Sequence, residues 1–476
     1  MAREYIEELK RVKDASLRSL YVCISEELLR RGITDEKRIK EISDKIYAEA
    51  MSKVTAMYDV GYGNFNIEEI TDKFGTLTSE PAFANWVWII YHIIYWQSLG
   101  DTLGYYNGKW EFNYNNPNAE PEEVNRMLYE FISLGGVNDI SINGWSASDD
   151  TVLYLDTMEV LLNLYLENKE FDNNDLGEKL RDAYLKSLPD LEDRHPGVTT
   201  INSLEMQKTI KWDQLPYNNK AIGNGSAMRS GYIGVFFLGS SRRVELIHAS
   251  IICSKITHNS AIAILGSITS ALFTAFALER SPINKWPSKL IRIIDSDIID
   301  NIIKEERPQD YDQFARGKLL YVGQWRDYTR KFFSGLNPIL DQKWMQDPVE
   351  RYRYLANNFS KGCDFPGGCA DDCLIMAYDS LLRSNGSYEK LLVLSILHPG
   401  DSDTVGSIAF SWYGAYYCNP RNSFFVKPMF SELEFKKRIK EASDKILKIS
   451  IPLFYDHLLS HVVRKYLSDF LDKLKK

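Results

Sequence analysis

The chain has 476 residues and a formal net charge of −8, from 57 lysines and arginines against 65 aspartates and glutamates. Apolar residues make up 44% of the chain and charged residues 26%, values that exclude a disordered or collagen-like protein. The net negative charge argues against the broad basic surface of a duplex-binding protein, so we expect no nucleic-acid partner. The length allows one large domain or up to about three.

The cysteines and the apolar stretches indicate the compartment. Six cysteines are too few for a disulfide scaffold, and the spacing of Cys363, Cys369 and Cys373 lacks the second half of a zinc motif. We therefore expect free thiols in a reducing compartment. The uncharged stretch 261–278 just reaches membrane-spanning length, but its Gly, Ser and Thr residues favour a buried helix. With a charged start and no signal core, the sequence predicts a cytoplasmic protein without a membrane contact.

Helical patterns follow one another along most of the chain. Residues 1–58 carry two or three amphipathic patterns, and the glycines and proline of residues 59–85 are typical of a connector. Polar loops are expected at 113–121 and 189–200. After a helix that starts near residue 86, helical segments are expected at 152–166, 203–209, 242–256, 260–280, 285–304, 347–359, 370–384, 388–397, 404–417, 431–448 and 452–475.

Strand patterns are scarce, and they do not alternate with the helical ones. The predicted fold class is therefore all-α. We expect a helical extension at residues 1–87, a core domain at 88–450 and a C-terminal helix at 451–476. The extension could dock a partner or pack onto the core, because amphipathic helices fit both roles equally.

Two clusters of carboxylates lie far apart in the sequence, each directly before an apolar run. They are residues 148–151 (SDDT) and 401–404 (DSDT). Either cluster could simply cap a helix, because Ser, Thr and Asp are preferred at the N-cap. If the clusters converge, their carboxylates repel one another unless cations neutralise them. Oxygen ligands of this kind suit Mg²⁺, Mn²⁺ or Ca²⁺ rather than zinc.

A glycine-rich segment at residues 223–231 (GNGSAMRSG) is a third candidate. Its small residues allow backbone N–H groups to approach an anion such as a diphosphate. The segment is neither a Walker A loop nor a convincing dinucleotide fingerprint, because no strand pattern precedes it.

Together these segments resemble the ADP-ribosylglycohydrolase family, most closely its ADP-ribosylarginine hydrolase branch. The segment YYNGKWEF (residues 105–112), which is part of the first motif quoted below, is specific to that branch. The resemblance extends over residues 88–448. The matching motifs are SLGDTLGYYNGKWEF (98–112), WSASDDT (145–151), DRHPG (193–197), GNGSAMRSGYIG (223–234), TH (257–258), SALFTAFAL (270–278), MAYD (376–379) and HPGDSDT (398–404).

The resemblance implies an orthogonal helical bundle with two Mg²⁺ ions in a cleft, which removes ADP-ribose from arginine side chains of ADP-ribosylated proteins. It implies a monomer, since the family cleft is built within one chain. The implied metal ligands are Ser148, Asp149, Asp150, Asp401, Asp403 and Thr404. The implied catalytic acids are Asp149, Asp150 and Glu111. The implied substrate contacts are Gly223, Asn224, Gly225, Ser226, Met228, His258, Asp372 and Ser402.

Two alternatives stay open. The loop at residues 365–371 (FPGGCAD) departs from the family's Trp-Gly-Gly-type loop, which leaves room for another linkage, such as ADP-ribosylserine or O-acetyl-ADP-ribose. The chain could also be a catalytically silent binder of ADP-ribose. The presence of all the acids of both clusters argues against a silent member.

Overall fold

The computed structural model describes residues 24–25, 28–29, 32–46, 81–113, 121–167, 172–363, 365–418, 426–447, 449 and 453. Within these ranges the regular secondary structure is helical, apart from the two-residue strands β1 (Phe333–Ser334) and β2 (Asn337–Pro338) and one isolated bridge. The predicted all-α fold class is confirmed. Most of the predicted extension 1–87 and of the C-terminal helix 451–476 lies outside the described residues, and those boundaries stay predictions.

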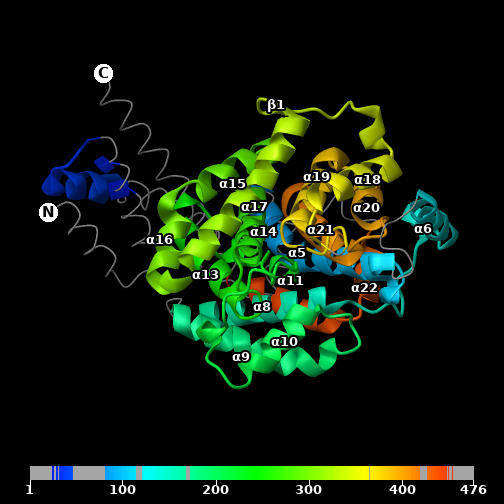
Figure 1. Cartoon of the computed structure of the whole chain (residues 1–476), viewed down its shortest axis with the longest axis horizontal. Helices are drawn as coiled ribbons and strands as arrows, with labels where there is room; N and C mark the ends of the chain where they lie inside the picture. Colours follow the sequence, from blue (N-terminus) through cyan, green and yellow to red (C-terminus); the bar gives the residue numbers. More distant parts are fainter. Residues whose placement is uncertain are drawn as a thin grey trace.

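The α-helices are arranged around a central one, α14 (Figure 1). They are α5 (Pro81–Tyr105), α6 (Pro121–Ser133), α7 (Gly136–Asp139), α8 (Asp149–Leu166), α9 (Asn173–Leu191), α10 (Val198–Gln207), α11 (Gly225–Arg229), α12 (Ile233–Phe236), α13 (Arg243–Lys255), α14 (Ala261–Leu278), α15 (Trp286–Ile294), α16 (Asp297–Glu306), α17 (Tyr311–Phe332), α18 (Pro348–Phe359), α19 (Asp372–Ser384), α20 (Tyr388–Ile396), α21 (Ser402–Tyr417) and α22 (Lys427–Glu432). Residues 36–46 and 436–447 are also helical.

The short 3₁₀ turns mostly lie between these helices. They are η2 (Tyr106–Gly108), η3 (Glu111–Asn113), η4 (Trp212–Gln214), η5 (Ser240–Arg242), η6 (Ile283–Lys285), η7 (Pro308–Asp310) and η8 (Lys343–Gln346). The first two follow α5 directly and lead the chain into the site described below.

Helix α14 has no charged residue because other helices cover it on every side. It packs against α11, α12, α13, α17 and α21. Among the described helices it is the one long and apolar enough to cross a membrane, yet 94% of it is buried inside the protein. As expected, α14 is a core helix, and its small residues let neighbours approach closely. A Cβ added to Gly266, for example, would lie 2.7 Å from the Cβ of Ala370.

The expected helices differ from the observed ones in two ways. The single helix expected at 285–304 is two helices, α15 and α16, because the chain turns into an extended conformation at Ser296. Helices α6, α9 and α17 occur where no helix is expected. The loop expected at 189–200 begins late, because α9 continues through Pro189 to Leu191.

Helices α5 and α21, distant in sequence, pack antiparallel and unusually close together. A Cβ added to Gly100 would overlap the carbonyl oxygen of Gly406, and one added to Gly104 would overlap that of Ser402. The Ser402 hydroxyl also donates a hydrogen bond to the Gly104 carbonyl, at 2.8 Å. This contact brings the N-terminus of α21 next to the C-terminus of α5, where two of the conspicuous sequence motifs meet.

Replacing Gly100 with Ala should destabilise the protein, because the added methyl group meets backbone that cannot move without separating the two helices. We expect Gly100→Ala to lower the free energy of unfolding, measured by urea denaturation, by about 1–3 kcal/mol. Gly323→Ala in α17 is the matched control, since nothing lies within 4 Å of its added Cβ. That change should stabilise the protein by about 0.5–1 kcal/mol. Equal effects of the two substitutions would contradict the close contact.

Candidate active site

The two carboxylate clusters, which are about 250 residues apart in sequence, meet in space. The Thr404 hydroxyl of the second cluster donates a hydrogen bond to Asp150 Oδ1 of the first, at 3.2 Å and across 254 residues. Asp149, Asp150, Asp401 and Asp403 all line one cavity of about 590 Å³. The convergence on which the metal hypothesis depended is therefore present in the structure.

Each cluster also caps a helix, so the two readings of the sequence are compatible. Ser148 is the N-cap of α8, and its hydroxyl accepts a hydrogen bond from the Asp150 N–H at 3.2 Å. Asp401 is the N-cap of α21 and accepts from the Thr404 N–H at 3.2 Å. The positive ends of the two helix dipoles thus face the carboxylates and offset part of their repulsion.

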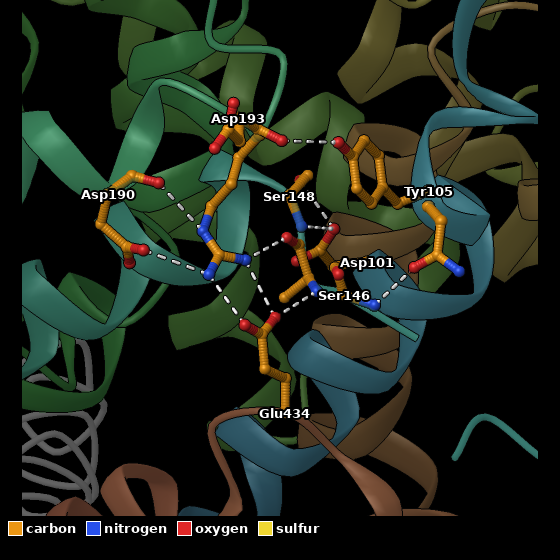
Figure 2. Close-up of polar contacts among 10 residues, drawn as sticks. Asp101, Tyr105, Ser146, Ser148, Asp190, Asp193 and Glu434 are labelled. Atoms are coloured by element: carbon orange, nitrogen blue, oxygen red, sulfur yellow. Dashed lines mark hydrogen bonds and ion pairs between the residues drawn. The ribbon is translucent and has the colours of Figure 1, made fainter. Parts of the chain in front are cut away.

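Asp101 on α5 holds the first cluster in place. Its carboxylate accepts hydrogen bonds from the Ser148 N–H and hydroxyl, at 3.3 and 2.7 Å (Figure 2). It also accepts hydrogen bonds from the N–H and hydroxyl of Thr151. Burial, and next the charge of Asp403, raises the pKa of Asp101 to about 7. Sequence reasoning did not single out Asp101, although it lies in the Gly-Asp of the motif at residues 98–112.

Burial and mutual repulsion dominate the electrostatics of the cavity. They raise the pKa values of Asp149, Asp150 and Asp403 well above the ordinary range, and burial raises that of Asp401 to about 6. Asp150 Oδ2 is buried and meets no hydrogen-bond donor among the described residues. An unsatisfied buried carboxylate oxygen among like charges is the environment that a bound cation would relieve.

Glu111 in η3 supplies another carboxylate to the cavity, and it is paired with a histidine. Its pKa lies well above the ordinary value because of burial and, next, the charges of Asp403 and Asp401. His195 Nδ1 lies 3.0 Å from Glu111 Oε2. The His195 ring packs over Gly108, where any side chain would overlap it. His195 lines the cavity and was not expected as a site residue.

The glycine-rich segment also lines the cavity, next to the second cluster. The Asn224 amide donates to Asp401 Oδ2 at 2.8 Å and to the Gly367 carbonyl at 2.9 Å. This amide therefore links the segment both to the second cluster and to the loop before α19.

His258 lies against the same segment in a hydrogen-bonded chain. Arg229, fully buried, donates to the Gly225 carbonyl and to the Thr257 hydroxyl, and that hydroxyl lies 2.8 Å from His258 Nδ1. Burial, and next the charge of Arg229, lowers the pKa of His258 to about 3, so the imidazole is neutral. If the hydroxyl hydrogen goes to Nδ1, then Nε2–H is available as a donor toward the cavity.

Most residues expected to form the site do line the cavity. They are Glu111, Asp149, Asp150, Gly223, Asn224, Gly225, Met228, His258, Asp401, Asp403 and Thr404.

Four other expected residues stand behind this lining. The hydroxyls of Ser148, Ser226 and Ser402 donate to Asp101 and to the carbonyls of Ala263 and Gly104, respectively. Asp372 accepts hydrogen bonds from the N–H groups of Gly367 and Cys369, at 2.7 and 3.0 Å, and so shapes the loop at 365–369. Their roles as metal or substrate ligands stay predictions.

The cysteines near the cavity differ from expectation. The structure joins Cys363 and Cys369 in a disulfide, so the prediction of free thiols is wrong for this pair. Cys373 is free and buried. The disulfide closes the short loop that carries Phe365. The centres of the Phe365 and Phe112 rings are 4.7 Å apart, and both residues line the cavity.

Comparison with known proteins identifies the family. The family model for ADP-ribosylglycohydrolase matches residues 94–421. A protein of Acanthamoeba polyphaga mimivirus, L444, named as an ADP-ribosyl glycohydrolase, is 56% identical over 347 residues, which are 73% of this chain and 67% of the relative. ADP-ribosylhydrolase ARH1 of Dictyostelium discoideum is 29% identical over 342 residues, which are 67% of this chain and 84% of the relative.

A solved structure described as an ADP-ribosylglycohydrolase-related protein complex aligns with 77% of this chain and 99% of its own. Its identity is 18% and the TM-score is 0.47, which is too weak to bear on the fold. The family model and the mimivirus relative suffice to assign the family, since each match covers more than half of the chain. The chain therefore belongs to the ADP-ribosylglycohydrolase family of hydrolases.

Proposed function

We propose that this protein is a Mg²⁺-dependent hydrolase that removes ADP-ribose from ADP-ribosylated arginine side chains. The observation that supports it most is the convergence of both carboxylate clusters and Glu111 on one cavity of about 590 Å³. Arginine as the acceptor is favoured by the YYNGKWEF motif and by the 29% identity to a relative named ARH1.

The donor set fits hard divalent cations. Two Mg²⁺ ions would be held by Ser148, Asp149, Asp150, Asp401, Asp403 and Thr404, whose ligand atoms are all oxygens. The orphaned Asp150 oxygen and the raised pKa values of the cluster support this assignment. When bound, the ions would coordinate ribose hydroxyls and lower the pKa of a water molecule.

The side chains would share the proton transfers of the hydrolysis. Asp149 or Asp150 would take the proton of the attacking water, because both line the cavity. The pKa of Glu111 is raised, so its carboxyl group holds a proton more readily than that of an exposed glutamate. Glu111 would therefore exchange a proton with the leaving guanidine. The remaining carboxylates would stabilise the positive charge that develops on the ribose.

The part of the cavity that the glycine-rich segment lines would hold the ADP portion. Gly223, Gly225 and His258 line this part, and His258 Nε2 offers a neutral donor there. Lys220 is the one lysine or arginine among the described residues that line the cavity, and it suits a diphosphate. We also propose, from the sequence alone, that the protein acts as a cytoplasmic monomer without a nucleic-acid partner.

The decisive experiment measures the release of free ADP-ribose from an ADP-ribosyl-arginine protein, with Mg²⁺ and with a chelator. Release should require the cation. Asp150→Asn keeps the side-chain shape but removes a ligand charge, so kcat should fall by about 100- to 10,000-fold. Asp327→Asn, an exposed carboxylate on α17, is the matched control and should retain full activity.

Other outcomes would change the assignment. Release from an ADP-ribosyl-serine peptide but not from arginine would refute the proposed linkage. Binding of ADP-ribose without release from either substrate would refute the proposal that the protein is a hydrolase.

The Asp150→Asn protein should unfold at a higher temperature than wild type in the chelator, because one repelling charge is gone. That result would show that lost activity is not lost folding.

The stability of the metal-free protein should depend on pH in a definite direction. Asp101 and Asp401 have pKa values of about 7 and about 6 in the folded protein, against about 4 in an unfolded chain. The unfolded state therefore loses these protons first, and the two groups reduce the free energy of unfolding as pH rises from about 4 to about 7.

The gain in the free energy of unfolding on adding Mg²⁺ should correspondingly grow over the same pH window, because cation binding requires ionised carboxylates. Urea denaturation at several pH values, with Mg²⁺ and with a chelator, measures both quantities. A Mg²⁺ effect that is constant between pH 5 and 7, or that shrinks, would contradict the assignment of the carboxylates as ligands.

A further inference from the structure

The loop that leads into α8 is held by a carboxylate from the far end of the chain. Glu434 Oε2 accepts a hydrogen bond from the Ala147 N–H at 2.8 Å, across 287 residues (Figure 2). Arg194 donates to the Ala147 carbonyl at 2.7 Å. Both backbone polar groups of the residue that precedes Ser148 are thus fixed by side chains.

Arg194 and Glu434 also hold each other. The guanidinium donates two parallel hydrogen bonds to the carboxylate, at 2.9 and 2.8 Å. It donates to the carbonyl and the carboxylate of Asp190 as well, and it stacks over the ring of Phe435. Such a two-pronged pair is rigid and geometrically specific. Burial raises the pKa of Glu434, but the hydrogen bonds from Arg194 and Ala147 outweigh burial, and the pKa lies below its ordinary value.

Three consecutive N–H groups of the loop are held by three separate side chains. Asn107 accepts from Ser146 at 2.7 Å, Glu434 from Ala147, and Asp101 from Ser148. Asn107 and Asp101 belong to the region that the family model covers, whereas Glu434 lies beyond its end at residue 421. The middle of the three anchors therefore comes from outside the matched domain.

A simpler role for Glu434 would be to tether the C-terminal segment. The same segment offers a comparison, because Glu432 also holds this loop, at Ser141 and at the Ile142 N–H. Those contacts lie seven and six residues before Ser148 and involve neither Arg194 nor Ala147. A tether would make Glu432 and Glu434 equivalent, while a role in the site would distinguish them.

We propose that Glu434, together with Arg194, is a positioning residue that fixes Ala147 and hence the metal-binding residues 148–150. The segment 426–447 then completes the active site although it lies beyond residue 421, where the match to the family model ends. This inference rests on the proposed function, since it assigns to that site a further support. Its effect should appear in cation affinity and turnover rather than in substrate binding.

The test compares Glu434→Gln with Glu432→Gln in the full chain. Residues that orient metal ligands typically change affinity or activity by about 10- to 100-fold when altered. We expect Glu434→Gln to raise the Mg²⁺ concentration for half-maximal activity and to lower kcat by about that factor, with KM for the ADP-ribosylated substrate changed by less than about threefold. Glu432→Gln should leave all three values within about threefold of wild type, even if the melting temperature falls equally.

Two further measurements make the result independent of turnover and of folding. Direct Mn²⁺ binding, followed by the electron paramagnetic resonance signal of the free ion, should weaken in Glu434→Gln and not in Glu432→Gln. The double variant Arg194→Gln/Glu434→Gln should lose little more than Glu434→Gln alone, because the two residues act as one unit.

Equal effects of the two glutamate variants, or unchanged Mn²⁺ affinity in Glu434→Gln, would overturn the positioning role and leave Glu434 as a tether. If the wild-type protein releases no ADP-ribose from any substrate, the proposed function fails instead. Mn²⁺ binding still decides the positioning role in that case.

Discussion

Like charges confined in a buried cavity are the constraint on which this structure depends. Five carboxylates line the cavity, from Glu111, Asp149, Asp150, Asp401 and Asp403, and a sixth, Asp101, stands behind them. Their repulsion would separate the helices that carry them if nothing opposed it. Two helix N-termini, an asparagine amide and several hydroxyls offset part of this repulsion. The repulsion that remains, together with burial, raises the pKa values of the carboxyl groups. The site is thus arranged to accept positive charge.

The surrounding fold supplies the rigidity that such a cavity needs. The close antiparallel contact of α5 with α21 fixes Asp101 and Glu111 relative to Asp401 and Asp403, because backbone meets backbone there without intervening side chains. The uncharged helix α14 packs against α21 and against α11 of the glycine-rich segment, and α21 in turn packs against α5. The connecting loops are then held by hydrogen bonds between side chains and backbone groups. In this way a mostly helical bundle acquires an active site made of loops and helix ends.

Much of this could be predicted from the sequence, and the remainder was hidden for identifiable reasons. The helix caps and the convergence of the clusters followed from residue types and from a family resemblance. Helix α17 was missed because its buried side is aromatic rather than aliphatic, with Phe314, Tyr321, Trp325 and Tyr328 among many charged residues. Glu434 was missed for a different reason. A carboxylate that accepts a hydrogen bond from one backbone N–H group 287 residues away leaves no pattern at either position.

The anchoring of Ala147 by Glu434 has a consequence for how the protein is made. A ribosome exposes the first acid cluster long before it reaches residue 434, so the loop at 146–148 emerges with one of its three anchors still missing. During that interval the acids of the first cluster cannot be held in their final geometry. The active site would therefore reach its full activity only when the segment that carries Glu434 docks, after the acids of both clusters have already emerged.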